Sequence, residues 1–518
     1  MLYILIFSLI VKIISLLNIP IEQAYLTFII MMETPLTLPQ YNWNSRDSIN
    51  LILWSLSCLA SLGIINNSHV IIVIEILSWL WLIIDSILEN LGQKHILILF
   101  LYKISIFQYV FLYLPKLKEK SMNCDVLYRN SRRLILHQSL EFKRELYSKI
   151  NWNARFIGIK GPKGVGKSTM LLQYIKENLK DENVLYVSLD DMWFATNSIM
   201  DLVEYHYVNG GTHLFLDEIH KCAHWQTYIK NIYDNYPTLK VVFTGGSMLQ
   251  IEKGEGDLSR RVAMYTMNGM SFREYLNFEG ILDHPVISLE DLLTKHVSIA
   301  SDITEKIRII PHFKDYCKFG YYPFYKEDKE GLHARLNEVC RQVIESDIPS
   351  VEKVEYVTIQ KLKKLLMIIA LQVPFIPKMD DLYTQLETTR EQGLKLLELL
   401  QRGALLGLLK TKVKAVKQMA APEKMFLDNP NLMYAFNKNP EIGTIRETFF
   451  YNQVSRVAEV YYPKKGDFQI NDNIIIEVGG ADKSFNQIKD IPNSYLAIDN
   501  VEFGRGNKIP LWLFGFLY

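Results

Sequence analysis

The eight residues 161–168, which read GPKGVGKS, restrict the fold of this chain more than any other segment. They follow a short apolar run, RFIGIK at 155–160, and precede the helix-like stretch TMLLQYIKENLK. This is the pattern GxxxxGK[ST] in the strand, loop and helix context that gives it meaning. The pattern predicts a buried strand, a glycine loop and a helix whose first amides point at negative charge.

The chemistry of this loop is phosphate binding. Glycines let the backbone wrap a phosphate chain, Lys167 supplies a positive charge to the β- and γ-phosphates, and the Ser168 hydroxyl can ligate Mg²⁺. A glycine-rich turn that matches by chance is the alternative. The predicted nucleotide-binding residues are Gly161, Pro162, Lys163, Gly164, Val165, Gly166, Lys167, Ser168 and Thr169.

A second element argues against a chance match. The run HLFLDEIH at 213–220 is an apolar strand that ends in two carboxylates. In this context Asp217 is predicted to hold Mg²⁺, directly or through water, and Glu218 to polarise the attacking water. The competing interpretation of such a pair is a helix N-cap. Together with the glycine loop, the pair predicts a nucleotide hydrolase.

Two further segments offer groups for the γ-phosphate. The strand-like run KVVFTGGS at 240–247 ends in polar residues, of which Thr244 and Ser247 are candidates, although a hydroxyl that caps a turn is the alternative. Arg260 and Arg261 follow, and an arginine here could act in its own or a neighbouring subunit, whereas solvated surface arginines are the competing view. With the strand-like run VLYVSLDD at 184–191, the order of elements predicts an α/β fold with a parallel sheet.

Taken together, GPKGVGKS, HLFLDEIH, FTGGS and SRRV followed by MSFREYL resemble bacterial and archaeal ATPases of the AAA+ class that join an AAA-type core to a C-terminal domain of unknown function. The resemblance runs from about Met122 to Tyr518. It implies ATP and Mg²⁺ as ligands, Ser247 as the γ-phosphate sensor and Arg261 as the arginine of a Gly-Arg motif. The glycine of that motif is replaced by Arg260. No Asn-Lys-x-Asp motif for guanine is visible.

The middle of the chain, 282–430, is predicted to be helical and to include a winged helix. KFGYYPFY at 318–325 and ESDIPS at 345–350 resemble turns of the same family and carry no obvious chemistry. Between residues 374 and 417 the pattern is helix, turn, helix and basic hairpin. The cations that could meet DNA are Arg390 and Lys395 on the presumed recognition helix and Lys410, Lys412, Lys414 and Lys417 on the wing. A packing or nucleotide-sensing module is the alternative.

The last segment, 431–518, is predicted to be a small α+β domain that resembles the restriction-endonuclease-like core. Asp467 and Glu477 fall symmetrically about the turn residue Asp472, so they are expected opposite one another on an antiparallel pair. With Glu447 on a preceding helix, they form a candidate second divalent-metal site. Gly479 stands where that family's motif has lysine, unless Lys483 or Lys489 takes its place. A degenerate nuclease fold used for binding is therefore expected over an active nuclease.

The first 120 residues are much more apolar than the rest. The runs 70–88 and 96–114 approach the ~20 residues that a membrane helix needs, and Lys116, Lys118 and Lys120 follow them. The positive charge predicts a cytoplasmic ATPase domain that these helices anchor in the membrane. A mis-assigned start, with Met122 as the true first residue, is the alternative.

Charge and cysteine content exclude other classes. The chain has 518 residues with 57 Lys and Arg against 56 Asp and Glu, which excludes a polybasic protein held to nucleic acid by bulk charge. Its five cysteines form no CxxC pair, so no zinc ribbon or thioredoxin-like site is expected.

The predicted domain boundaries are 1–120 for the hydrophobic segment, 121–281 for the ATPase core, 282–430 for the helical and winged-helix region, and 431–518 for the nuclease-like domain.

The leading hypothesis is an ATPase, as a monomer or a homo-oligomer, whose cycle moves the winged-helix and nuclease-like domains on DNA. A slow nucleotide-gated switch or scaffold without nuclease activity, with or without a membrane anchor, is the alternative. A nuclease regulated by ATP is a third hypothesis.

Overall fold

The computed structural model describes residues 124–246, 258–352, 354–372, 376, 378–415 and 420–518. Within the chain, Met122–Tyr518 is one compact unit. The predicted membrane segment 1–120, Ser247 and Lys417 lie outside the described residues. In the part that is described, none of the helices combines the length and apolar character that crossing a membrane requires.

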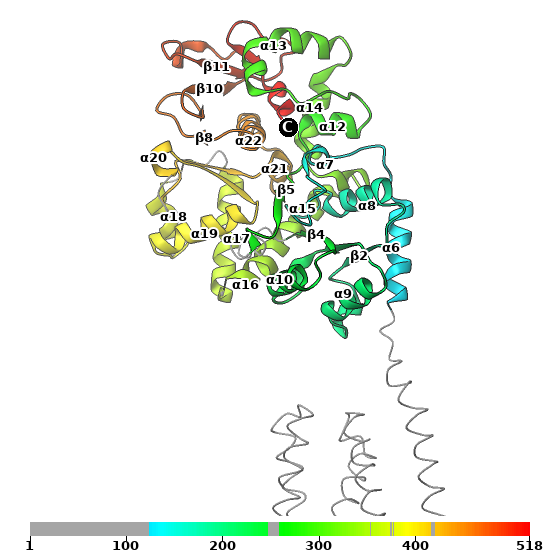
Figure 1. Ribbon diagram of the computed structural model, residues 1–518. Helices are drawn as coiled ribbons and strands as arrows, with labels where there is room; N and C mark the ends of the chain where they lie inside the picture. The colour runs from blue at the N-terminus through cyan, green and yellow to red at the C-terminus, as the bar shows by residue number, and fades with distance from the viewer. Residues whose placement is uncertain (1–123, 247–257, 353, 373–375, 377, 416–419) are drawn as a thin grey trace, which may run out of the picture. The chain divides into compact units, whose positions relative to one another are not determined.

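A parallel five-stranded sheet forms the first part of this unit (Figure 1). The strands lie in the order β2-β3-β4-β1-β5, and every neighbouring pair is parallel. They are β1 (Phe156–Lys160), β2 (Val184–Ser188), β3 (His213–Asp217), β4 (Lys240–Gly245) and β5 (Ala263–Thr266). The α/β fold predicted from the apolar runs and the glycine loop is therefore present.

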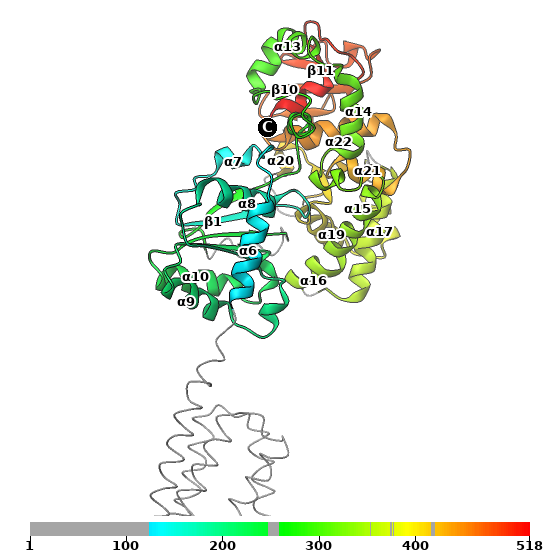
Figure 2. The ribbon, with the colours of Figure 1, turned by 90° about the vertical axis from the view of Figure 1, so that its right-hand side faces the viewer.

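Helices connect these strands and cover the sheet, as the turned view shows (Figure 2). They are α6 (Asp125–His137), α8 (Lys167–Asn178), α9 (Ile199–Val208) and α10 (Trp225–Asn235). Successive residues of a strand point to opposite faces. Accordingly, Phe215 belongs to one hydrophobic cluster, whereas Leu214 and Leu216 belong to the other. Burial on both faces explains why the central residues of β1, β2, β3 and β4 are mostly apolar.

A helical region follows the first sheet. It comprises α12 (Phe272–Phe278), α13 (Leu289–Thr304), α14 (Ile309–Phe319), α15 (Leu332–Gln342), the π-helical turn η4 (Val343–Asp347), α16 (Ile348–Val351), α17 (Tyr356–Gln372), α18 (Met379–Gln385) and α19 (Arg390–Arg402). An antiparallel pair, β6 (Leu406–Leu409) and β7 (Lys424–Leu427), comes next, with α20 (Lys412–Ala415) between its strands. Helices α18 and α19 lie where helix, turn, helix was predicted. The basic hairpin predicted up to residue 417 is not found in that form within the described residues, because α20 follows β6 and the strand that pairs with β6 is β7.

The C-terminal part is a mixed five-stranded sheet preceded by α21 (Pro430–Phe436) and α22 (Ile442–Val454). Its strands are β8 (Val460–Tyr461), β9 (Phe468–Ile470), β10 (Ile474–Gly479), β11 (Ser494–Ile498) and β12 (Lys508–Pro510). They lie in the order β12-β11-β10-β9-β8, with β8, β9 and β10 antiparallel and β10, β11 and β12 parallel.

Helix α13 packs on this C-terminal sheet, although it lies far from it in the sequence (Figure 1). The amide of Ile287, just before α13, donates to the carbonyl oxygen of Phe516 at 2.9 Å. His296 Nε2 lies 2.9 Å from the carbonyl oxygen of Gly506. In the folded chain, residues 287–304 therefore accompany residues that the sequence assigned to 431–518.

Candidate nucleotide site

The loop between β1 and α8 has the backbone of a phosphate cradle. Gly164 and Gly166 have φ angles of +80° and +96°, which side chains other than glycine rarely adopt. A Cβ on Gly161 would lie 2.2 Å from the carbonyl oxygen of Met267, so the loop also depends on close backbone approach. The glycine positions and the donors that follow them fit a phosphate chain.

Lys167 is the first residue of α8 and is 5% exposed. Its Nζ donates to the carbonyl oxygens of Gly161 at 2.9 Å and Pro162 at 2.8 Å, so the ammonium lies across the loop. Burial lowers the pKa of Lys167 to about 8, although the charges of Glu218 and Asp217 oppose the shift. At pH 7 most of the Lys167 side chains are therefore protonated, and this charge is lost as the pH rises through about 8.

Asp217 is the last residue of β3 and is buried. Tyr186 on β2 donates its hydroxyl to Asp217 Oδ2 at 2.6 Å, and Thr244 on β4 donates to Oδ1. The predicted magnesium ligand is thus held by hydroxyls from both neighbouring strands. Thr244 was a sequence candidate, whereas Tyr186 was missed. The only signal was a hydroxyl-bearing aromatic in an apolar strand.

Glu218 follows Asp217 with a φ angle of +53°, which is strained for a residue with a side chain. Its Oε2 accepts the amide of Gly246 at 3.2 Å, and its own amide donates to Thr244 Oγ1 at 3.3 Å. Burial raises the pKa of Glu218, and the charge of Lys167 opposes that shift. This conformation turns the carboxylate towards the end of β4.

His220 lies beside this carboxylate, with Nδ1 3.1 Å from Glu218 Oε2. Burial and the nearby positive charge of Lys221 lower the pKa of His220 to about 3. The imidazole is therefore neutral at pH 7 and adds no charge to the site.

A cleft of about 1940 Å³, measured with its open mouth, extends from the glycine loop. Its walls include Gly164, Gly166, Lys167, Ser168, Thr169 and Glu218, together with side chains from three distant segments, among them Phe142, Asn277, Phe278, Pro323 and Phe324. The rings of Phe142 and Phe278 lie 5.0 Å apart, centre to centre. Beyond the phosphate cradle, the cleft thus offers the apolar faces and amide groups that a nucleobase requires.

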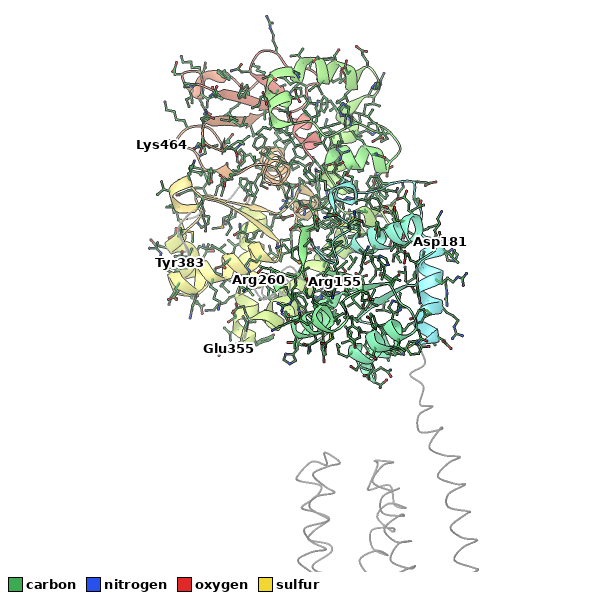
Figure 3. All side chains as sticks on the ribbon, viewed as in Figure 1. Arg155, Asp181, Arg260, Glu355, Tyr383 and Lys464 are labelled. Atoms are coloured by element: carbon green, nitrogen blue, oxygen red, sulfur yellow. The ribbon has the colours of Figure 1, made fainter. Side chains whose placement is uncertain are left out.

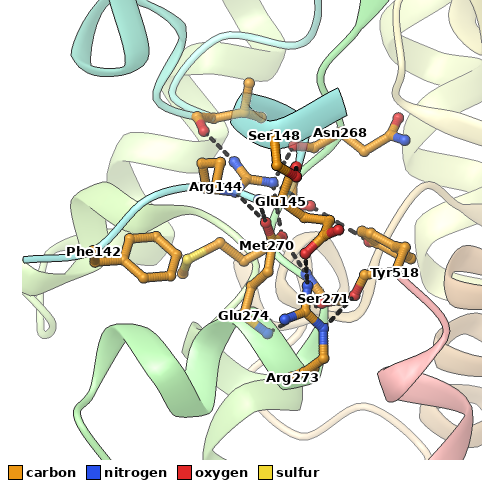
Figure 4. A network of polar contacts seen from close by, with 12 residues as sticks. Phe142, Arg144, Glu145, Ser148, Asn268, Met270, Ser271, Arg273, Glu274 and Tyr518 are labelled. Carbon is orange, nitrogen blue, oxygen red and sulfur yellow. Dashed lines mark hydrogen bonds and ion pairs between the residues drawn. The ribbon is translucent and has the colours of Figure 1, made fainter. Parts of the chain in front are cut away.

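A buried polar network around Arg144 and Glu274 holds the backbone of the loop (Figure 4). Arg144 donates to the carbonyl oxygen of Val165 in the loop at 2.5 Å and forms a two-pronged pair with Glu274 at 2.9 and 3.0 Å. It also donates to the carbonyl oxygens of Asn268 and Gly269 at 2.8 and 2.9 Å. Burial alone would raise the pKa of Glu274, but Arg144 reverses the shift, so this pKa lies below its usual value.

The neighbouring arginine of the SFREYL segment joins this network to the C-terminal part. Arg273 donates to Glu145 Oε2 at 2.8 Å and to the main-chain oxygen of Tyr518 at 3.1 Å, which Ser271 Oγ also approaches at 2.7 Å (Figure 4). The sequence showed SFREYL only as part of a family resemblance. In the structure it links the loop to residues more than two hundred positions away.

The two other turns without obvious chemistry also meet the loop. Phe324 of KFGYYPFY lies against Gly164, where an added Cβ would come within 2.5 Å of its ring. Asp347 of ESDIPS pairs with Lys163, whose Nζ lies 3.1 Å from Oδ2 and 3.2 Å from Oδ1. Neither contact was visible in the sequence, because each partner lies far along the chain.

Arg261 lies near the amino ends of the parallel strands, whereas the loop follows the carboxyl end of β1. Arg261 precedes β5, in which Ala263 pairs with Ile157 near the start of β1. Its guanidinium pairs with Asp234 at 3.3 Å. Arg155, which precedes β1, and the exposed Arg260 are labelled in Figure 3. An arginine finger at this position would have to act on a second chain, and its role stays a prediction.

Of the five described cations predicted to meet DNA, three pair with carboxylates. Lys395 on α19 lies 3.1 Å from Glu352, Lys412 pairs with Asp472, and Lys414 lies 2.6 Å from Glu423. Arg390 is exposed at the start of α19. The hairpin therefore presents less free positive charge than its sequence indicates.

The C-terminal carboxylates occupy the predicted register. Ile476 pairs with Phe468, which sets Glu477 beside Asp467, and the amide of Val478 donates to Asp467 Oδ2 at 2.8 Å. Lysines accompany them: Lys424 pairs with Glu447 and lies 3.8 Å from Asp467, and Lys483 lies 2.6 Å from Glu477.

Lys483, one of the two lysines considered in place of Gly479, thus reaches the acidic pair, whereas Lys489 is exposed. Across the described residues, no three His, Cys, Asp or Glu side chains are grouped to hold a metal ion. The second metal site stays a prediction.

Comparison with known proteins identifies the first domain. Residues 153–276 match the model of a family described as an AAA domain, and this span holds the glycine loop, Asp217 and Glu218. The chain is also 25% identical over 369 residues to an uncharacterized protein of Methanocaldococcus jannaschii, in an alignment that covers 63% of this chain and 76% of that protein. Residues 153–276 are thus similar to an AAA domain.

Among solved structures, similarity is found to a Walker-type ATPase of Pyrococcus abyssi, with 13% identity and a TM-score of 0.32 over 57% of this chain and 95% of that chain. It is also found to the AMPPCP-bound DnaA of Aquifex aeolicus, with 15% identity and a TM-score of 0.21 over 50% of this chain and 84% of that chain.

Proposed function

We propose that the chain binds ATP with Mg²⁺ and hydrolyses it. The observation that carries this proposal is the position of Asp217 and Glu218 at the end of β3, in the same sheet whose strand β1 leads into the glycine loop and Lys167. Binding without hydrolysis requires only the loop. A buried acid for the metal and a second carboxylate beside it are the further groups that hydrolysis needs.

Each group of this chain has a defined part in that reaction. The loop amides and Lys167 bind the phosphates, and Ser168 and Asp217 would hold Mg²⁺, which when bound neutralises charge on the phosphate oxygens. Tyr186 and Thr244 hold the carboxylate of Asp217. Glu218, whose pKa burial raises, is suited to orient a water and accept its proton.

The base end of the cleft supports a nucleoside triphosphate. Phe142 and Phe278 line it with aromatic rings, and Asn277 adds an amide with both donor and acceptor groups. Adenine is proposed because of the family that the sequence resembles and because the AAA domain matches.

The test is phosphate release by the full chain together with nucleotide binding. Wild type should bind ATP and release phosphate. Glu218→Gln should retain binding but slow hydrolysis by roughly two or more orders of magnitude, since it removes only the group that orients water. Glu204→Gln, which changes an exposed acid on α9, is the matched control and should hydrolyse like wild type. Equal hydrolysis in wild type and Glu218→Gln would refute the assignment.

We further propose that the cycle moves the C-terminal sheet and the region of α18, α19, β6 and β7, which is proposed to act as a winged helix. The pairing of Lys395, Lys412 and Lys414 with carboxylates favours the alternative of a nucleotide-gated switch or scaffold over a DNA-acting machine. Stimulation of phosphate release by duplex DNA would support action on DNA. Tight nucleotide retention with slow turnover would support the switch.

A further inference from the structure

The segment 343–352, called the turn 343–352 below, contacts both the glycine loop and the helices α17 and α19. Asp347 is its contact with the loop, and it is 3% exposed. Its carboxylate pairs with Lys163 at 3.1 Å, and burial raises its pKa while Lys163 opposes the shift. A carboxylate this deeply buried depends strongly on its counterion.

Lys163 lies at the phosphate end of the site. Burial lowers the pKa of Lys167, and the positive charge of Lys163 lowers it further, so the two ammonium groups are near enough to repel. An added triphosphate would place negative charge close to both. The ammonium of Lys163 would then have two competing partners, the phosphates and Asp347.

The same turn is fastened to the helical region by other contacts. Glu345 pairs with Lys363 on α17, and Glu352 lies 3.1 Å from Lys395 on α19. Val343 packs on Gly403 at the end of α19, where an added Cβ would come within 2.9 Å of it. A shift of this turn would therefore be felt by both helices.

The local geometry allows such a shift. Residues Val343–Asp347 form a π-helical turn, a conformation that is rare and often found at functional sites. A small cavity of about 20 Å³, the space of roughly one water molecule, lies beside the ion pair and is lined by Lys163, Asp347, Gly246 and Gly403.

We propose that Lys163 and Asp347 form a nucleotide-sensing pair, in which a bound triphosphate draws Lys163 away from Asp347 and thereby releases the turn 343–352 to move α17 and α19. This inference rests on the proposed ATP site and names the contact through which that site controls the helical region. Because coupling is reciprocal, removing the carboxylate of Asp347, which competes for Lys163, strengthens triphosphate binding.

The experiment uses the full chain and two readouts other than turnover. Binding of a non-hydrolysable ATP analogue and of ADP is measured by calorimetry, and amide hydrogen exchange is followed in 343–352 and 390–402. In wild type, the analogue should raise exchange in 343–352 above the level seen with ADP. Asp347→Asn should bind the analogue about fivefold or more tightly than wild type, and its exchange should no longer respond.

Two further variants complete the design. Lys163→Gln removes the other member of the pair, and the double variant with Asp347→Asn should show no additional loss of the exchange response. Glu338→Gln, which breaks the exposed pair with Arg341 on α15, is the matched control and should behave like wild type.

The outcomes separate the two proposals. If wild type binds neither nucleotide, the proposed function fails. If wild type binds the analogue but its exchange response is unchanged in Asp347→Asn and Lys163→Gln, the sensing pair is refuted while the ATP site stands. Should Asp347→Asn fail to fold, the double variant decides the question, because it leaves neither charge without its partner.

Discussion

The hydroxyl of Tyr186 donates a 2.6 Å hydrogen bond to Oδ2 of Asp217, across two neighbouring parallel strands. Ser188 is level with Asp217 in this pairing, so Tyr186 lies two positions back on the same face of the sheet. The acid predicted to hold the metal is thus fixed by a residue with no place in the sequence motif.

Tyr186→Phe should lower the stability of the full chain by about 1 kcal/mol, because it leaves a buried carboxylate oxygen without its donor. The midpoint of thermal unfolding measures the effect. Tyr205→Phe, which removes a hydroxyl from an exposed residue of α9, is the control and should change the midpoint little. Equal midpoints for Tyr186→Phe and wild type would show that the hydrogen bond does not stabilise the fold.

Nucleotide affinity should fall as the pH rises above about 8. Burial lowers the pKa of Lys167 to about 8, so the charged form, which binds phosphate, is present below this pH and lost above it. Affinity for ATP should drop up to about tenfold per pH unit beyond that point. Calorimetry between pH 7 and pH 9 measures the drop.

Two variants check that Lys167 is the titrating group. Lys167→Arg, which stays charged throughout, should remove the pH dependence even if it binds more weakly. Lys167→Ala should lose most affinity at every pH. A wild-type affinity that stays constant up to pH 9 would contradict the assignment.

Arg144→Ala should destabilise the chain by about 3–5 kcal/mol, since it leaves Glu274 as a buried charge without its partner. Arg144→Ala combined with Glu274→Gln should cost less than the sum of the two single changes, because neither charge is then left alone. Denaturant unfolding provides the measurement. Arg341→Ala, from an exposed pair on α15, is the control. Additive losses in the double variant would argue that the two residues do not act together.

Arg261→Ala should leave nucleotide binding unchanged, because Arg261 lies at the end of the strands opposite to the loop and pairs with Asp234. If a second chain receives this arginine, hydrolysis per chain in wild type rises with protein concentration, and the variant loses that rise. Arginine fingers contribute roughly 10³-fold or more to such rates.

Asp234→Asn frees Arg261 without removing it, so the rise with concentration should persist in this control. A wild-type rate that is independent of concentration and equal to that of Arg261→Ala would exclude the finger.

The C-terminal carboxylates should not cut DNA. Lys424 and Lys483 accompany Glu447, Asp467 and Glu477, and Gly479 stands where the nuclease pattern has lysine. Plasmid incubated with the full chain and Mg²⁺ or Mn²⁺ should remain intact. Cutting that disappears in Glu477→Ala would overturn this expectation.

A second variant probes the same cluster by metal binding. Lys424→Met removes the ammonium that pairs with Glu447 and leaves the carboxylates without that cation. We expect this variant to bind Mn²⁺ more tightly than wild type in calorimetry, because the metal would replace the lost charge. Lys489→Met is the control, because it removes an exposed lysine of the same C-terminal region.

The nucleotide loop and the acidic strand could be predicted from the sequence because their signals are local. GPKGVGKS, the apolar run before it and the helix after it are contiguous, so the backbone alone brings the loop amides and Lys167 together. The register of Asp467 and Glu477 was likewise predictable, since both flank a short turn about Asp472. Strand type, turn and spacing decide such features within a few residues of one another.

The tertiary structure decided which distant residues meet at that loop. Val165 is held by Arg144, which pairs with Glu274, Gly164 lies against Phe324, and Lys163 pairs with Asp347. The tertiary structure likewise decided that Tyr186 bonds to Asp217 and that Arg261 pairs with Asp234, away from the loop. These pairings depend on how strands align and how helices pack across the whole unit. The sequence determined the chemistry of the loop by itself, whereas only folding, which brings residues far apart in the chain together, decided what supports it.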